Sequence, residues 1–228
     1  STYIQESIFE DVIQKQKLMN YLDKIVNPKI IIASSSSGIT ASDFSKKVEH
    51  KERYIVAHPL NPPYLIPLVE IVPSPWTSSY AIEFVYDLMN EIGQEPIKIK
   101  KEIKDFVLNR LQGALLNEAW ALYREGYASL DDIDKTVSKG LGMRWSFMGP
   151  FETIDLNAPG GIADYANRLG KLYYSIAKSR ENAIPWDKNL INKVETERRK
   201  NLPNEKLEEK QRWRDNYLMK FNKFINDK

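Results

Sequence analysis

The chain has 228 residues, enough for one large domain or two small ones with a buried core. Its 33 basic and 31 acidic residues leave a formal charge of +2, so no long-range field favours nucleic acid or a membrane surface as a partner. The lack of cysteine excludes a disulfide scaffold and a thiolate nucleophile, and it favours the cytoplasm. With only two histidines and no cysteine, a metal site is not expected.

The first part of the chain alternates helical and strand-like segments. Apolar spacing predicts two long helices, and a short one whose cap is Thr40 or Ser42. Compact β-branched or apolar runs between them predict buried strands. In chain order, the expected elements are a helix at 8–25, a strand at 29–33, a helix at 40–47, strands at 54–57 and 68–71, a helix at 77–92 and a strand at 96–99.

The second part contains no strand signal after Lys100. A helix over 106–123 is apolar nearly all round, so we expect it to be buried on several sides. Another helix begins after Ser129, a glycine- and proline-rich loop follows, and helical segments continue into a charged, aromatic tail at 192–228. The predicted fold class is therefore α/β followed by all-α, with domains at 1–101 and 102–228. The loop is marked by Gly140, Gly142, Gly149 and Pro150.

A histidine and a carboxylate stand out against the apolar strands. His58 follows the strand at 54–57, and Glu70 interrupts the apolar run IPLVEIVP. A buried carboxylate needs a partner, and an imidazole beside it would form a general acid/base whose tautomer the carboxylate fixes. The alternative for His58 is a hydrogen-bonded structural histidine. His50 lies in the charged run KKVEHKER and is expected on the surface.

Two further polar positions are candidates for holding a substrate oxygen. Asn109 is an amide in an otherwise apolar helix, where it requires a hydrogen-bond partner. Ser37 ends a run of four serines after a strand, where hydroxyl and N–H groups can bind an oxygen. The plain alternatives are a satisfied polar group at a domain junction for Asn109, and a loop or helix cap for the serines.

Several blocks of the sequence resemble one known family. They are AHPLNPPYLIPLVEIVP, KEIKDFVLNRLQ, GLGMRWSFMGPFETIDLNAPGG, and RRKNLP with QRWRDNYL. The first two resemble the 3-hydroxyacyl-CoA dehydrogenase family at large. The other blocks are most similar to its lambda-crystallin branch, whose members are L-gulonate 3-dehydrogenases. The resemblance covers nearly the whole chain and corresponds to the carboxyl-terminal two-thirds of that family.

This resemblance implies a Rossmann-type domain, of which only the carboxyl-terminal part is present, and a helical domain that forms homodimers. It implies NAD as cofactor and His58 as the acid/base that Glu70 orients. Ser37 and Asn109 would bind the substrate oxygen, and Asn61 would lie beside substrate and nicotinamide. Together with Ser37 and Asn61, the residues implied to contact the cofactor are Glu10 and Lys15. The residue pattern alone would make these two solvated helix charges.

Arg144 is a candidate of a different kind. It is the one cation of the glycine-rich, aromatic loop GLGMRWSFMGP. A guanidinium can bind a carboxylate in bidentate fashion, so we expect Arg144 to bind the carboxylate of a sugar acid, from the same or the second subunit. The alternative is a surface ion pair.

The sequence contains no Gly-x-Gly-x-x-Gly phosphate loop. The family's dinucleotide fold places this loop between its first strand and helix. We therefore expect the 228 residues to be part of a longer enzyme, and to neither bind NAD tightly nor turn over on their own.

Three functions remain open on this basis. The first is an NAD-dependent dehydrogenase acting on the 3-hydroxyl of a small hydroxy acid, best L-gulonate. The second is a 3-hydroxyacyl-CoA dehydrogenase, which would not need a cation for a carboxylate near the reaction centre. The third is a non-catalytic crystallin-like protein or truncated paralogue. The retained quartet His58, Glu70, Ser37 and Asn109 favours an enzyme. Basic and acidic residues are interleaved, so nucleic-acid binding has no support.

Overall fold

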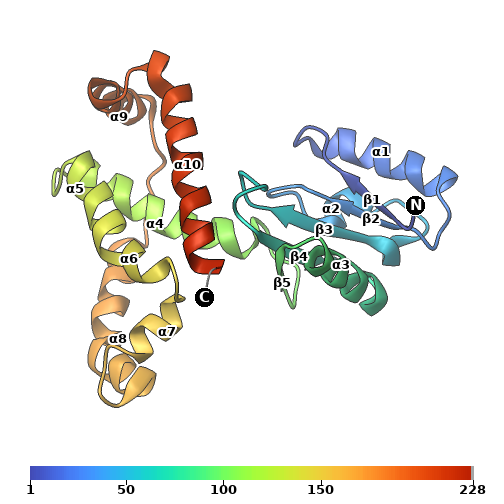
Figure 1. Ribbon diagram of the computed structural model, residues 1–228, viewed down its shortest axis with the longest axis horizontal. Coiled ribbons are helices and arrows are strands. Elements are labelled where there is room, and N and C mark those ends of the chain that lie inside the picture. Colours follow the sequence, from blue (N-terminus) through green and yellow to red (C-terminus); the bar gives the residue numbers. More distant parts are fainter. Residues whose placement is uncertain (227–228) are drawn as a thin grey trace. The chain divides into compact units, whose positions relative to one another are not determined.

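A computed structural model describes residues 1–226 (Figure 1). It contains two compact units. The first is formed by Ser1–Leu115 together with the carboxyl-terminal segment from Glu209, and the second by Leu116–Glu208. The division between them falls inside a long helix, α4 (Phe106–Arg124). The functional domain boundary at 101/102 remains a prediction.

Five strands form one sheet in the first unit, in the order β1-β2-β3-β4-β5 among the residues described. The pairs β1/β2, β2/β3 and β4/β5 are parallel, whereas β3/β4 is antiparallel. The first strand was not predicted, because four residues are too few to show a period. The strands are β1 (Tyr3–Glu6), β2 (Ile31–Ser34), β3 (Tyr54–Pro59), β4 (Leu68–Pro73) and β5 (Glu95–Lys98).

Helices cover both faces of this sheet. Helices α1 (Val12–Ile25) and α2 (Ala41–Ser45) lie on one face, and α3 (Ser79–Glu91) lies on the other (Figure 1). Thr40 caps α2, as one of the two predicted caps, and a 3-10 turn (Lys51–Arg53) precedes β3. Because side chains alternate along a strand, each face has its own core. One core contains Met19, Ile32, Phe44, Tyr54, Val56, Val72 and Phe106, and the other contains Ile31, Ala33, Ile55, Ala57, Val69, Ile71 and Val85.

Helix α4 enters the first unit through an unusual backbone turn. Asp105 and Phe106 have φ angles of 62° and 51°, a region that residues other than glycine rarely occupy. The Phe106 side chain is fully buried in the core, which holds this turn in place. The predicted burial of the helix on several sides is wrong for its outer face. Leu111 is 62% exposed, so part of the apolar surface of α4 faces solvent in this structure.

The second unit is entirely helical. The loop predicted around Gly140 and Gly142 is wrong, because a π-helix (Thr136–Leu141) and helix α6 (Gly142–Trp145) run through it. A side chain at Gly142 would come within 2.9 Å of the carbonyl oxygen of Val137, so glycine here permits close packing of helical turns instead of breaking them. The other helices are α5 (Leu130–Lys135), α7 (Pro150–Asp155), α8 (Gly161–Ser179), α9 (Lys188–Asn201), a 3-10 turn (Asn204–Lys206) and α10 (Leu207–Asn226).

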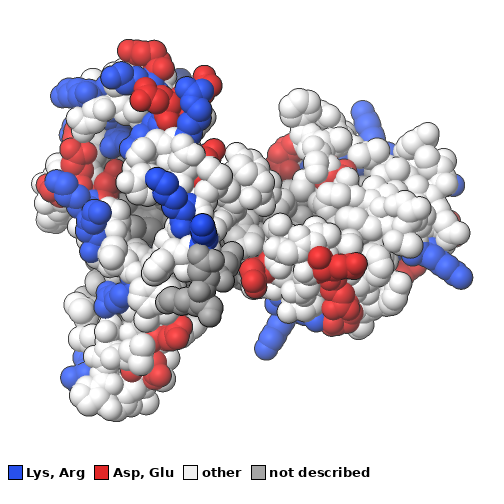
Figure 2. All heavy atoms as spheres, viewed as in Figure 1, with Lys and Arg blue, Asp and Glu red and all other residues white. Residues whose placement is uncertain are grey.

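Polar and aromatic contacts join α4 to the helices that follow it in the second unit. The Arg180 guanidinium donates to Glu118 through two nitrogens, at 2.7 and 3.1 Å, and to Glu125 at 2.7 Å. The rings of Trp120 and Trp186 stack with centroids 4.3 Å apart. On the face that Figure 2 shows, positive and negative side chains of this unit are interspersed.

The observed architecture confirms the predicted class of an α/β part followed by helices, with no strand between residues 100 and 226. Among those same described residues, no helix combines the length and apolar character needed to cross a bilayer.

Candidate active site

The central feature of the site is the pair formed by His58 and Glu70. Antiparallel pairing sets the two residues directly opposite each other on β3 and β4. The His58 Nδ1 atom lies 2.9 Å from Glu70 Oε2, and the two side chains are only 7% and 1% exposed. The Phe106 ring packs against the imidazole, with ring centroids 5.5 Å apart. The sequence-based expectation of a paired histidine and carboxylate thus has a matching geometry.

The second oxygen of Glu70 holds the start of α4. Glu70 Oε1 accepts the backbone N–H groups of Val107 and Leu108, at 2.9 and 3.0 Å. These are first-turn amides with no partner inside the helix, and a carboxylate is the group that a helix amino terminus favours. Burial alone would raise the pKa of Glu70. The hydrogen bonds from His58, Leu108 and Val107 outweigh it, so the net pKa is lowered from its ordinary value.

This arrangement fixes which nitrogen of His58 is available for chemistry. An ionised Glu70 can only accept hydrogen bonds, so Nδ1 must carry a proton toward it. Within the described chain, no hydrogen bond reaches Nε2. A neutral His58 therefore presents Nε2 as a proton acceptor, and its charged form is stabilised by the carboxylate behind it. The pair has the geometry of a general acid/base.

Ser37 and Asn109 come together at the edge of the sheet where β1, β2 and β3 end. Asn109 lies on the first turns of α4, and its Nδ2 donates to the backbone carbonyl oxygen of Ser37 at 2.6 Å. The Ser37 side chain is exposed. The same helix therefore receives the Glu70 carboxylate at its start and positions the Asn109 amide. The hydrogen-bond partner expected for the Asn109 side-chain amide is therefore the backbone carbonyl oxygen of Ser37.

The loop that carries Ser37 wraps around the carboxylate of Glu10. Glu10 Oε1 accepts the Ser36 hydroxyl at 2.5 Å and the backbone N–H groups of Ser37 and Gly38 at 2.9 and 3.0 Å. The Ile39 amide approaches it at 3.4 Å. Burial opposes ionisation of Glu10, but these hydrogen bonds and the nearby Lys15 ammonium outweigh it and lower the pKa. Glu10 thus organises this loop.

Lys15 is not the solvated charge that the residue pattern alone predicted. Its side chain is 1% exposed, and its ammonium lies 2.8 and 3.0 Å from the two oxygens of Glu6. It also donates to Ser34 Oγ at 3.4 Å, and lies 3.7 Å from Glu10 Oε2. Glu6 was not predicted from the sequence, and Ser34 was considered only as part of the serine run at 34–37. No sequence signal beyond its position nine residues before Lys15 points to Glu6.

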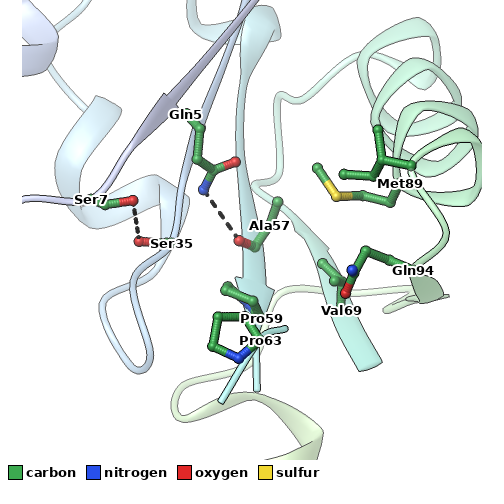
Figure 3. Close-up of a pocket in the computed structure, with 10 residues that line it drawn as sticks. Gln5, Ser7, Ser35, Ala57, Pro59, Pro63, Val69, Met89 and Gln94 are labelled. Atoms are coloured by element: carbon green, nitrogen blue, oxygen red, sulfur yellow. Dashed lines mark hydrogen bonds between the residues drawn. The ribbon is translucent and has the colours of Figure 1, made fainter. Parts of the chain in front are cut away.

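A small pocket of about 240 Å³ opens beside the ends of β1, β2 and β3, on the face covered by α3 (Figure 3). Gln5 Nε2 donates to the Ala57 carbonyl oxygen across it, and Ser35 Oγ donates to Ser7 Oγ. Gln94 Oε1 is buried at its wall and has no hydrogen-bond partner within the described chain.

Asn61 and Arg144 are placed separately from these contacts. Asn61 is exposed, follows β3, and is joined to Pro62 by a cis peptide bond. Arg144 lies in the second unit, where it lines a pocket of about 440 Å³ with aromatic side chains such as Trp145, Phe151 and Tyr165. Its guanidinium makes no ion pair with any described residue, so the alternative of a surface ion pair has no partner in this structure.

The lowered pKa of Glu70 has a consequence for stability. A carboxylate whose pKa is depressed in the folded state contributes stability that is present above its unfolded pKa and is lost as pH falls through the folded value. We expect the free energy of unfolding to fall on acidification below the ordinary value of 4.5, and Glu70→Gln to flatten this acid limb. Urea unfolding of both proteins between pH 3 and pH 7 tests this. Parallel curves for the two proteins would contradict it.

Residues 1–103 match a family model described as 3-hydroxyacyl-CoA dehydrogenase, NAD binding domain, and residues 106–201 match its C-terminal domain. The chain is 40% identical over 223 residues to a lambda-crystallin homolog of Rattus norvegicus, covering 97% of this chain and 70% of that protein. An L-carnitine dehydrogenase of a Pseudomonas species is 40% identical over 169 residues, covering 74% of this chain and 53% of that protein.

Solved structures with the same arrangement are also similar. An NAD+-dependent 5-dehydrogenase of a hydroxypyridine carboxylic acid superposes with a TM-score of 0.74 and 26% identity, covering 86% of this chain and 62% of that one. A 3-hydroxyacyl-CoA dehydrogenase of Archaeoglobus fulgidus gives 0.67 and 28%, covering 86% and 65%. This chain spans less than two thirds of either. It belongs to the 3-hydroxyacyl-CoA dehydrogenase family of NAD-dependent oxidoreductases, with a Rossmann-like NAD-binding part followed by a helical domain.

Proposed function

We propose that the protein acts as an NAD-dependent dehydrogenase on the 3-hydroxyl of a small hydroxy acid, with L-gulonate as substrate and 3-dehydro-L-gulonate as product. The observation that carries this proposal is the buried His58–Glu70 pair, with Nδ1 held at 2.9 Å and Nε2 left available. A base next to a carboxylate is what removal of a hydroxyl proton requires.

In this proposal, each residue has a defined task. His58 Nε2 takes the proton of the substrate hydroxyl, and Glu70 stabilises the imidazolium that results. Ser37 and Asn109 hold the substrate oxygen by hydrogen bonds, so that charge developing on it is stabilised. Bound NAD supplies the acceptor for the hydride that leaves the carbon bearing this oxygen. In the reverse direction, His58 returns the proton to the oxygen.

The pocket in Figure 3 does not account for cofactor binding. Its volume of about 240 Å³ is below the usual range of about 300–1,000 Å³ for small-molecule pockets, and it lies on the face of the sheet opposite the His58 imidazole. Ser37, Asn61, Glu10 and Lys15 are proposed to hold the cofactor, directly or through the loop that they organise.

The choice of a hydroxy acid over a thioester depends on Arg144. Its guanidinium has no ion-pair partner among residues 1–226, and it lines an aromatic pocket, which supports recognition of a carboxylate. A relative named L-carnitine dehydrogenase supports the same choice, because carnitine is itself a hydroxy acid. The second candidate, a 3-hydroxyacyl-CoA dehydrogenase, is favoured by a relative of that name in Gibberella moniliformis, 41% identical over 170 residues. A non-catalytic crystallin-like role is the third candidate. The hydrogen-bonded pairs His58–Glu70 and Asn109–Ser37 weigh against it.

We also propose that the protein works as a cytoplasmic homodimer. Large apolar side chains are exposed on the helices of the second unit. Exposed apolar surface often marks a protein–protein interface, and this supports a second copy of the chain as partner. Examples are Phe151 at 75%, Tyr174 at 68%, Met143 at 58% and Leu172 at 53%. We place the proposed NAD-binding domain at residues 1–101 and the proposed helical dimerisation domain at residues 102–228.

The dehydrogenase proposal predicts a large effect of removing the imidazole. In the whole protein, His58→Asn should lower kcat for NADH formation from L-gulonate by about 10²–10⁴-fold, the usual contribution of a general base. His50→Asn is the matched control, since His50 lies outside the site with its side chain 34% exposed, and it should leave kcat unchanged. NADH absorbance measures both. Equal activity of wild type and His58→Asn would contradict the proposal.

The substrate proposal predicts a selective effect at Arg144. Arg144→Ala should raise KM for L-gulonate by about 10- to 100-fold, because a charge-assisted hydrogen bond contributes roughly 1.5–3 kcal/mol. KM for an uncharged secondary alcohol should not change. Arg168→Ala, which removes a cation paired with Asp164 in the same unit, is the control. Equal increases in KM for both substrates would show that Arg144 does not read the carboxylate.

A further inference from the structure

The buried ion pair of Glu6 and Lys15 lies directly beneath the loop that carries Ser37. Glu6 ends β1 and Ser34 ends β2, and the sheet register places these two residues side by side. Ser34 Oγ donates to Glu6 Oε2 at 2.6 Å, and the backbone N–H of Ile8 donates to Glu6 Oε1 at 2.6 Å. Lys15, from α1, contacts both carboxylate oxygens. One ammonium and one carboxylate thus tie together two strand ends and a helix.

From this pair, a continuous set of contacts reaches the reacting side of the site. Ser34 Oγ also accepts the N–H of Ser36 at 3.2 Å. On the other side, the Lys15 ammonium faces Glu10, whose carboxylate accepts the amides of Ser37 and Gly38. The position of Ser37 is therefore fixed on one side by the contacts of Glu6, Lys15 and Ser34. On the other side, it is fixed by the hydrogen bond from Asn109 to its carbonyl oxygen.

An ion pair this deeply buried gives little net stability. Desolvation of the two charges offsets most of their attraction, and apolar residues of similar volume often replace such a pair at no cost. Stability alone is thus a weak reason for these charges. In contrast, their geometry is specific, because the pair also contacts the Ser34 hydroxyl at the end of β2, and Ile8 and Glu10 between β1 and α1.

We propose that Glu6 and Lys15 are positioning residues that form a clamp on the Ser34–Ile39 loop, and that they place the Ser37 hydroxyl for the reaction. Lys15 acts on Ser37 through Glu6, Ser34 and Glu10, and its side chain is 1% exposed. This inference rests on the proposed dehydrogenase function for its catalytic consequence, but not for its structural one.

The test uses the double variant Glu6→Gln/Lys15→Met in the whole protein, because either single change would strand a buried charge and risk unfolding. Both substitutions preserve side-chain volume. Three quantities are measured: amide hydrogen exchange at Ser37 and Gly38 by NMR, the dissociation constant for NAD by calorimetry, and kcat with L-gulonate. We expect exchange to rise about tenfold and kcat to fall roughly 10- to 100-fold, the size expected when a positioned group moves slightly. NAD affinity should weaken only together with the rise in exchange, because the same loop belongs to the proposed cofactor site.

A second buried ion pair in the same unit provides the control. Arg53 and Asp23 are 2.8 Å apart with side chains 2% and 6% exposed, and Arg53 lies just before β3, at the opposite end of that strand from His58. Arg53→Met/Asp23→Asn should leave exchange at Ser37 unchanged.

The alternatives give different results. Unchanged exchange with unchanged kcat would make the pair merely structural and would overturn the clamp. Weakened NAD binding with unchanged exchange would make Lys15 a cofactor contact and would overturn it as well. If the wild type oxidises no hydroxy acid, the proposed function fails, and amide exchange alone then decides whether the clamp exists.

Discussion

The Glu70 carboxylate contacts both His58 and the first turn of helix α4, and it thereby fixes their positions relative to each other. One of its oxygens holds the His58 imidazole across an antiparallel strand pair, and the other holds the first amides of α4. Because both contacts are to the same rigid side chain, the base and the helix cannot move independently. The buried Phe106 ring fills the space between them. The His58 imidazole and the start of α4 are thus positioned by a residue of strand β4 and not by a loop.

The rest of the site depends on α4 being fixed in this way. Asn109 lies one turn into that helix and reaches the carbonyl oxygen of Ser37, so the position of Glu70 is passed on to the loop after β2. Glu10 closes the loop from its other side. Groups from β3, β4, α4 and two loops therefore form one network of hydrogen bonds. Such networks position polar groups more firmly than separate contacts do.

The residues that could be predicted from the sequence are those whose polar groups interrupt apolar segments. A histidine and a carboxylate that interrupt apolar strands could be found, because buried charge needs a partner, and the fold class followed from the change of periodicity after residue 100. It did not predict the burial of Lys15, since its partner Glu6 lies in a strand too short to show a period. Nor did it predict helical turns at Gly142, because glycine marks both breaks and close approaches. Which α4 amides meet Glu70 depends on tertiary packing.

The central claim, that Glu70 holds His58 with Nε2 free as the base, can be tested without any substrate. Nitrogen-15 NMR of the imidazole, in the whole protein at a pH where His58 is neutral, distinguishes a protonated nitrogen from an acceptor nitrogen. We expect Nδ1 to be protonated and Nε2 not, and Glu70→Gln to remove this preference. A neutral His58 with its proton on Nε2 would contradict the account, because the nitrogen facing the substrate could then no longer accept a proton.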